Sequence, residues 1–259
     1  MLKSISFVQI AISAVVLFLS IHSKVFAQNT RISNFNTIGW YTINANVKLS
    51  PKWSVNGEFQ LRRVELIKSS QQNLFRVALH YNVKPAVVLR VGYAYIDTYP
   101  YGIIPIQSAG RFFSEYRFFE AVSISAKTGI VDLTHRIMLE QRFIGRYKSS
   151  VSTSIDDHFF VNRIRYQLRM QIPLKGKSMA DHTPYLTAFD EIMIGFGKNV
   201  QENVFDQNRF AILLGYRLNN TFRIEAGFIN QTLQLGREVY GGNVFQYNSG
   251  VMVSTYLSF

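Results

Sequence analysis

The stretch NRIRYQLRM, residues 162–170, decides the fold class. Its even-numbered positions from Ile164 to Met170 are apolar or aromatic, whereas its odd-numbered positions from Arg163 to Arg169 are arginine or glutamine. Successive side chains of a β-strand point to opposite faces, so this pattern predicts a strand with one apolar and one cationic face.

The same alternation continues along most of the chain after residue 27. It is carried by eleven segments, near 40–49, 53–62, 73–83, 87–97, 111–125, 130–143, 158–172, 183–196, 205–218, 221–235 and 243–259. Strands of about eleven to fifteen residues, tilted by about 40°, climb roughly 28 to 38 Å and cover the ~25 Å apolar band of an outer-membrane barrel. Strands of soluble sandwiches are usually half as long. We therefore predict an all-β fold, an antiparallel transmembrane β-barrel.

The expected connections alternate between short and long. Tight turns are predicted at 50–52, 84–85, 126–129 and 219–220, and longer loops near 66–72, 98–110, 144–157, 197–204 and 236–242. Outer-membrane barrels have short periplasmic turns and longer external loops, so the last strand ends in the periplasm and the first clear strand descends. A periplasmic N-terminus then requires one more strand within residues 28–36. We expect about twelve strands, with ten as the fallback.

Two carboxylates break the predicted inside and outside pattern. Glu120 and Asp190 fall on the apolar parity, where a charge in the middle of a membrane is expensive. A β-bulge near each residue, which would turn the side chain away from lipid, is the repair that we expect.

The N-terminus has the layout of a secretory signal peptide. Lys3 precedes a short apolar stretch, and Val25-Phe26-Ala27 precedes polar residues, which predicts a signal peptide over residues 1–27 with cleavage after Ala27. Residues 28–259 then form the barrel domain. The 259-residue sequence contains no cysteine, which excludes disulfides, thiolate metal sites and a lipid-anchored N-terminal cysteine. We expect export to the outer membrane of a Gram-negative bacterium.

The last segment ends in an aromatic residue. Phe259 lies on the apolar parity of residues 251–259 and is similar to the signal read by the barrel-assembly machinery. We therefore expect that machinery, outer-membrane lipid and lipopolysaccharide as partners. The net charge of +12 does not indicate nucleic-acid binding, because the cations are spread over many strands and are not gathered in one patch.

A set of charged residues shares the polar parity and is predicted to face the barrel lumen. It consists of Glu58, Arg62, Arg76, Arg90, Glu115, Arg117, Arg136, Glu140, Arg142, Arg163, Arg165, Arg169, Glu191, Arg209, Arg223 and Glu225. Charges in a poorly hydrated interior are costly without partners, so we expect ion pairs across neighbouring strands. Eleven arginines against five glutamates leave six unmatched positive charges, which favours anions wherever water penetrates.

Residues for catalysis, metal binding or cofactor binding are not indicated. His80 has lumen parity, His135 has the outward parity, and neither has a Ser or Asn neighbour that would suggest a hydrolase triad. His158, next to Asp156 and Asp157, is interpreted as part of a solvated loop. The aromatic residues Trp40, Trp53, Tyr81, Tyr93, Tyr95 and Tyr216 fit interfacial girdles. We expect no enzyme and no cofactor.

Several motifs carry a resemblance over essentially the whole region after residue 27. They are Trp40, Glu58-x-Gln60-x-Arg62, Phe75-Arg76, Gly92-Tyr93, Glu115-Tyr116-Arg117, Arg136-x4-Gln141-Arg142-Phe143, Arg163-x-Arg165-Tyr166, Glu191, Asn208-Arg209, Gly215-Tyr216 and Phe259. In these the chain resembles the domain of unknown function 2490 family. The resemblance implies an outer-membrane barrel and brings no agreed reaction or ligand, so no catalytic residue is carried over.

Three functions remain open at the level of sequence. The first is a porin-like, narrow or plugged channel with an arginine-rich, anion-favouring lumen and an unknown small-molecule solute. The second is a closed barrel scaffold whose external loops bind a partner or a surface glycan. A rim enzyme that acts on lipid is the third.

Overall fold

The computed structural model describes residues 31–149 and 151–259, the second of two units into which the chain divides. The predicted signal peptide, residues 1–27, and its cleavage point after Ala27 lie outside the described residues. The strands are β1 (Ile32–Lys48), β2 (Trp53–Val64), β3 (Ser69–Lys84), β4 (Val87–Thr98), β5 (Phe113–Thr128), β6 (Val131–Arg146), β7 (Asp157–Pro173), β8 (Thr183–Phe196), β9 (Phe205–Arg217), β10 (Phe222–Val239) and β11 (Gly242–Ser258).

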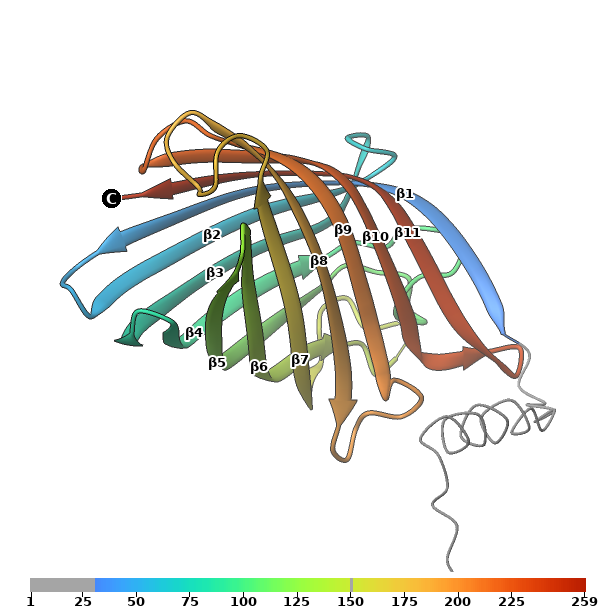
Figure 1. Cartoon of the computed structure of the whole chain (residues 1–259). Helices are drawn as coiled ribbons and strands as arrows, with labels where there is room; N and C mark the ends of the chain where they lie inside the picture. The colour runs from blue at the N-terminus through green and yellow to red at the C-terminus, as the bar shows by residue number, and fades with distance from the viewer. Residues whose placement is uncertain (1–30, 150) are drawn as a thin grey trace, which may run out of the picture. The chain divides into compact units, whose positions relative to one another are not determined.

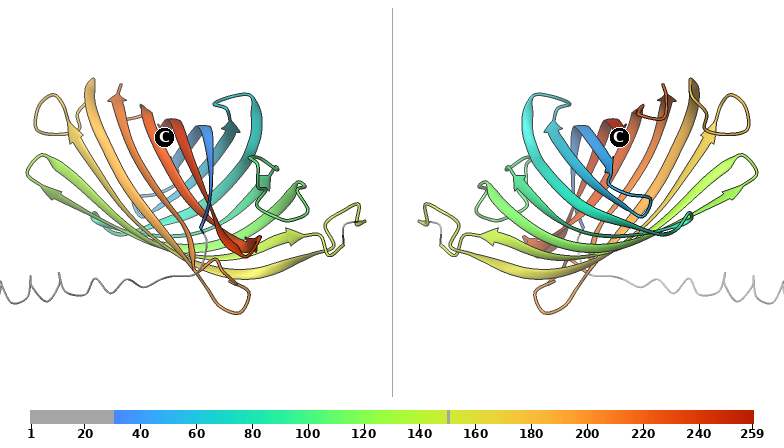
Figure 2. Two further views of the ribbon diagram at one scale, coloured as in Figure 1. Left: turned by 90° about the vertical axis from the view of Figure 1, so that its right-hand side faces the viewer. Right: turned by 90° about the vertical axis from the view of Figure 1, so that its left-hand side faces the viewer.

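These strands form one closed barrel in chain order, in which β1 lies beside β11 (Figure 1). Consecutive strands pair antiparallel, whereas β1 and β11 pair parallel, from Ile32 opposite Val244 to Asn46 opposite Ser258. The strands cross the barrel at a slant, as the two views of Figure 2 show.

The expected strand number of twelve, like the fallback of ten, is wrong, because the described residues contain eleven strands. The short extra strand expected within residues 28–36 is absent from the described part of that range, since residues 32–36 begin the continuous strand β1. An odd number of strands that reverse direction at every connection leaves the first and last strands parallel. The barrel is therefore antiparallel at every junction except this one.

The connections define two ends of the barrel. At the turn end lie residues 49–52, 85–86, 129–130, 174–182 and 218–221, and at the loop end lie residues 65–68, 99–112, 147–156, 197–204 and 240–241. The longer loop expected over 236–242 is wrong, because β10 and β11 extend to Val239 and from Gly242. The connection 174–182 is longer than the turns around it.

Alternation of side chains gives the barrel an apolar outside and a polar inside. Ile164, Tyr166 and Met170 of β7 are exposed, whereas Arg163 and Arg165 between or beside them are buried. Exposed apolar side chains recur on the other strands, with Leu79, Val91, Phe118, Ile212 and Leu214 among them. The hydrophobic surface of this chain is therefore turned outward, the reverse of a soluble sandwich.

Glu120 and Asp190 face outward as their parity requires, and the bulges expected beside them are wrong. The register shifts of the barrel lie at Arg62/Arg63, Asn82/Lys84, Met193/Ile194 and Gln234/Glu238. Each carboxylate instead accepts a hydrogen bond from a neighbouring strand: Gln141 Nε2 donates to Glu120 at 3.0 Å, and Asn208 Nδ2 donates to Asp190 at 2.9 Å. An outward-facing amide satisfies each carboxylate without a change of register.

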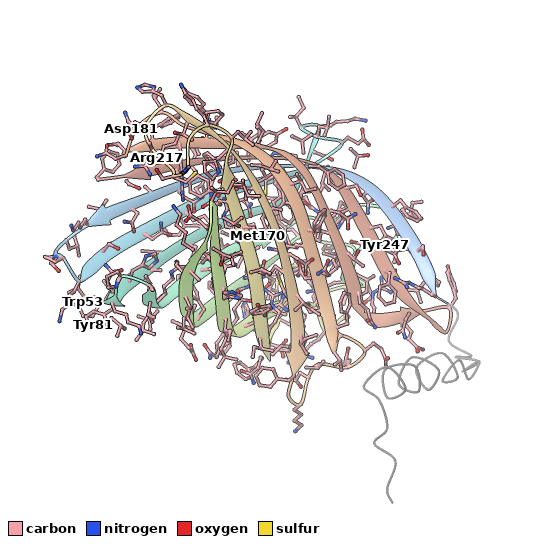
Figure 3. The ribbon with its side chains drawn as sticks, in the orientation of Figure 1. Trp53, Tyr81, Met170, Asp181, Arg217 and Tyr247 are labelled. Atoms are coloured by element: carbon pink, nitrogen blue, oxygen red, sulfur yellow. The ribbon has the colours of Figure 1, made fainter. Side chains whose placement is uncertain are left out.

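Aromatic pairs mark both ends of the barrel. The Trp53 and Tyr81 rings lie 4.6 Å apart at the turn end, where the ion pair between Asp181 and Arg217 lies on another part of the rim (Figure 3). Tyr247, at the opposite end, stacks on Phe35 at 5.1 Å. Such amphipathic rings suit positions between an apolar band and water.

Candidate functional site

The barrel interior holds the charged residues that the sequence assigns to the lumen. Ten of the sixteen are at most 11% exposed, and the remaining six line the turn-end cavity: Glu58, Arg76, Arg90, Arg136, Arg169 and Arg223. Most join a continuous layer of ion pairs across the middle of the barrel. We call the innermost part of this layer, Glu115, Arg117, Glu140, Arg142, Arg163, Arg165, Glu191, Asp206 and Arg209, the septum.

Glu140 of β6 lies at the centre of the septum and is 1% exposed. It faces Arg163 of β7 across the register, and Arg163 Nε donates to it at 2.7 Å. Arg165 Nη1 donates to the other carboxylate oxygen at 2.7 Å, and Arg117 Nη1 lies 3.8 Å from that oxygen. Both oxygens of this buried carboxylate are thus bound by guanidinium groups, which offsets the cost of burying its charge.

Glu191 and Glu115 extend the septum to both sides of Glu140. Arg136 and Arg165 each donate to Glu191 Oε1 at 2.7 Å, and Arg209 lies 3.8 Å from its other oxygen. Glu115 accepts from two further arginines, Arg117 at 2.6 Å and Arg142 at 2.6 Å.

Asp206 completes the septum and was not among the residues selected from the sequence. It is 2% exposed and pairs with Arg163 and, at 3.4 Å, with Arg142. Strict alternation from the inward Arg209 would place Asp206 outward. The register shift at Met193/Ile194, however, lies opposite this residue, and both Asp206 and Gln207 point inward. The bulge therefore turns the Asp206 carboxylate into the interior, which the alternation of the sequence does not predict.

With Asp206 the interior set contains six carboxylates and eleven arginines, so five arginine charges are in excess. Arg76 bonds Glu58 at 3.0 Å, and Arg169 pairs with Glu225 nearer the turn end. Among the described residues, three arginines of the set have no carboxylate within 4.0 Å: Arg62, Arg90 and Arg223.

Trp40 belongs to the interior and not to an outer girdle, which corrects the sequence-based interpretation. Its side chain is 2% exposed, and its Nε1 donates to Gln71 at 2.9 Å. The guanidinium of Arg62 lies 4.0 Å from its ring centroid and that of Arg209 lies 5.0 Å away. The indole faces thus stabilise two interior cations, one of which has no carboxylate partner.

The septum separates two cavities. The loop-end cavity has a volume of about 320 Å³ and the turn-end cavity about 650 Å³. Arg62 and Arg209 line both cavities, so they lie in the layer that divides them. Because Arg163 is 0% exposed and Glu140 is 1% exposed, the dividing layer is packed and leaves water no access to its centre.

The loop 99–112 folds over the loop-end cavity. Tyr101 is buried and accepts a hydrogen bond from Asn248 Nδ2 at 3.2 Å, and Gln246 and Arg237 donate to the backbone oxygens of Ile104 and Pro105. Burial raises the pKa of the Tyr101 phenol, which therefore stays neutral. An apolar cluster that includes Phe113, Ile144, Val161 and Val200 packs beneath the loops. The loop end is therefore capped by ordered chain.

Two interior glycines lie under aromatic rings of the neighbouring strand. A Cβ on Gly215 would lie 2.3 Å from the Tyr185 ring, and one on Gly92 would lie 2.5 Å from the Phe119 ring. Tyr185 is 0% exposed and donates to Glu225 at 3.0 Å. The absence of a side chain at each glycine leaves the space that its covering ring fills.

His80, His135 and His158 lie on three different strands, β3, β6 and β7. His80 lines the turn-end cavity, whereas His135 faces outward, where its Nδ1 lies 2.8 Å from Tyr166 Oη. The His158 ring lies 5.2 Å from that of Tyr116. Asp157 is bound by Arg146 at 2.7 Å, so this part of the 156–158 cluster is already paired. Residues 31–149 and 151–259 contain no group of three His, Asp or Glu side chains that could hold a metal ion.

The family model described as protein of unknown function (DUF2490) matches residues 37–239, from within β1 to the end of β10. The chain belongs to this family. The match covers every member of the septum and both Gly92 and Gly215, so the interior charge layer lies within the part that defines DUF2490. A comparison with curated proteins finds no match. Within the described residues, no helix is long and apolar enough to cross a membrane.

Proposed function

We propose that this DUF2490 protein is an outer-membrane barrel with a plugged, anion-favouring lumen. The observation that carries the proposal is the interior charge balance, in which six carboxylates face eleven arginines around a packed septum. The outward apolar side chains and the strand lengths support a position in a membrane, and the predicted signal peptide supports export.

The septum favours closure over free passage. Glu140 and Glu191 each bind two or three guanidinium groups, and removing water from these charges is tolerable only because they are paired. A solute in the turn-end cavity therefore meets a wall of ion pairs. The excess arginine charge lies on that wall and on the sides of the cavity, where it attracts anions.

Two measurements test this function. The mature protein should fractionate with the outer membrane and show heat-modifiable migration, and recovery as a soluble periplasmic protein would refute the proposal. In planar bilayers the unmodified barrel should give no steady conductance. A sustained conductance that prefers cations would contradict both the plug and the charge assignment.

The double variant Glu140→Ala with Arg163→Ala is designed to open the septum without changing its net charge. It removes one positive and one negative charge. The ion pairs of Asp206 with Arg142 and of Glu191 with Arg165 are retained. We expect this variant to conduct and its reversal potential across a salt gradient to indicate anion preference. The matched control is the double variant Glu65→Ala with Lys68→Ala, which removes an exposed pair in the 65–68 loop and should stay closed.

The loop end supports a second candidate, the closed scaffold. Ile67, Ile103, Val151 and Tyr240 are 74%, 91%, 82% and 99% exposed, and all lie in loop-end connections. Exposed apolar tips on an ordered cap suit contact with a partner or a surface glycan. Titration with purified surface polysaccharide tests it: Ile103→Ser and Tyr240→Ser should weaken binding, and absence of binding by the unmodified barrel would exclude the glycan.

A further inference from the structure

One wall of the turn-end cavity brings three arginines and a serine together. It is formed by β3, β4, β5 and β6 and carries Arg76, Arg90, Ser123 and Arg136, with His80 beside them. His80 faces Arg90 across the register of β3 and β4, and Ser123 faces Arg136 across that of β5 and β6. We call these four donor residues, Arg76, Arg90, Ser123 and Arg136, the donor wall.

Each member of the donor wall has a buried hydrogen-bonding atom without a partner. The atoms are the Nε groups of the three arginines and Oγ of Ser123, which is 3% exposed as a residue. A buried donor that makes no hydrogen bond costs free energy comparable to a lost hydrogen bond, and such groups are rare in folded proteins. Four of them on adjacent strands of one cavity indicate a ligand that accepts hydrogen bonds.

The charges of the donor wall identify the kind of acceptor. An Nη group of Arg76 donates to Glu58, and an Nη group of Arg136 donates to Glu191. The Nε groups of both arginines have no hydrogen-bond partner. Arg90, between them, has no carboxylate within 4.0 Å among the described residues. Arg76 and Arg136 carry the same charge as Arg90 and line the same cavity, so the three guanidinium groups repel one another. An anion between the three guanidinium groups would relieve this repulsion.

We infer that the donor wall binds a phosphate-class oxyanion, an inference that rests on the proposed anion-favouring function and names its site. A tetrahedral oxyanion offers oxygens in several directions, which suits donors on four strands, whereas a planar carboxylate has two oxygens in one plane. Charge-assisted bonds from guanidinium to phosphate are among the strongest in proteins. The cavity, at about 650 Å³, also has room for an organic group attached to the phosphate.

Entry to this site is from the turn end. Lys48, Asn82, Ser125 and Ser258 line the same cavity, and they lie in the parts of β1, β3, β5 and β11 at the turn end of the barrel. The septum closes the other side. The site therefore collects its ligand from the compartment at the turn end, which is the periplasm in the proposed orientation.

Calorimetric titration of the purified, full barrel in detergent with inorganic phosphate, in chloride buffer, tests the site. We expect saturable binding, similar binding of sulfate, and much weaker binding of acetate. Arg90→Gln should weaken phosphate binding by about ten-fold or more, because a charged donor is lost. Arg223→Gln is the matched control: it removes the same charge from the same cavity, at an arginine that lies over Tyr256 away from the donor wall, and should change binding by less than three-fold.

The outcomes separate the site from the general charge of the lumen. Equal loss in Arg90→Gln and Arg223→Gln would overturn the site, because binding would then follow net charge alone, and absence of saturable phosphate binding would overturn it directly. If Arg90→Gln does not fold, Ser123→Ala is used instead, because it removes only a hydroxyl group. If Ser123→Ala binds phosphate as well as the unmodified barrel does, the donor wall is overturned. Cation preference of the opened barrel would refute the proposed function even if phosphate binds, so the two failures are distinguishable.

Discussion

Glu140 and Arg163 face each other on adjacent strands in the middle of the barrel, and neither side chain is more than 1% exposed. An ion pair without access to water is stabilising only while both partners are present. In the proposed function, the septum that contains this pair closes the path between the two cavities, both of which are lined by its member Arg209. If this proposal holds, stability and closure depend on the same charged layer.

Neutralising one partner should destabilise the barrel strongly. Glu140→Gln leaves Arg163 and Arg165 with a neutral neighbour, and we expect a loss of about 3 to 5 kcal/mol in the free energy of unfolding. Urea unfolding in detergent, followed by the change in electrophoretic migration, measures it. Lys68→Ala removes a member of an exposed pair and should leave the midpoint unchanged. A Glu140→Gln barrel as stable as the unmodified one would show that the septum is not held by this pairing.

A side chain at Gly215 should be costly. Gly215→Ala brings a Cβ to 2.3 Å from the Tyr185 ring, and displacing a packed ring costs about 1 to 3 kcal/mol. Gly57→Ala, also within a strand, meets no atom within 4 Å and provides the control. The unfolding midpoint of Gly215→Ala should be lower than that of Gly57→Ala. Equal midpoints would mean that the Tyr185 ring moves freely.

Removal of Phe259 should slow assembly. Its backbone N–H donates to Asn46 at 2.9 Å and its carbonyl accepts from Lys48 at 2.8 Å, so the last residue joins the barrel to β1 in addition to presenting its ring on the outside. Pulse labelling followed by heat-modifiable migration gives the rate. If the shortened chain assembles as fast as the unmodified chain, the terminal aromatic is not used as a signal.

Anion preference in the opened barrel should depend on salt. The five excess arginine charges act through water, and their field is screened beyond about 8 Å at physiological ionic strength. Reversal potentials of the Glu140→Ala, Arg163→Ala variant should therefore indicate weaker selectivity as the salt concentration rises. A preference that stays constant over a ten-fold range of salt would point to size selection and not to charge.

The alternation of apolar and polar residues was sufficient to predict most strands, because side chains of a barrel strand point outward and inward in turn. The predicted segment 183–196 coincides with β8, and most others differ by a few residues at their ends. The strand count failed because β1 begins at Ile32, where Phe35 is exposed and the pattern is weak.

The register between neighbouring strands could not be predicted from the sequence. Asp206 points inward because of a bulge whose position depends on the partner strand β8, which no local pattern reveals. Trp40 was assigned by residue type, although its parity with Thr42, also buried, places it inside. The amides that hold Glu120 and Asp190 come from adjacent strands, so their role became visible only once the pairing was known.

The parallel junction of β1 and β11 sets an order of folding events. Every other junction joins strands that are consecutive in the chain, so each can form as a hairpin from local segments. At this seam, Ile32 meets Val244, and the chain between them must already be in place. A nascent sheet without β11 has two unpaired edges, one at β1 and one at β10, and both remain open to pairing with other chains until the final strand arrives. We therefore expect the seam to be the last junction to form and an incomplete barrel to be most exposed to aggregation at this point.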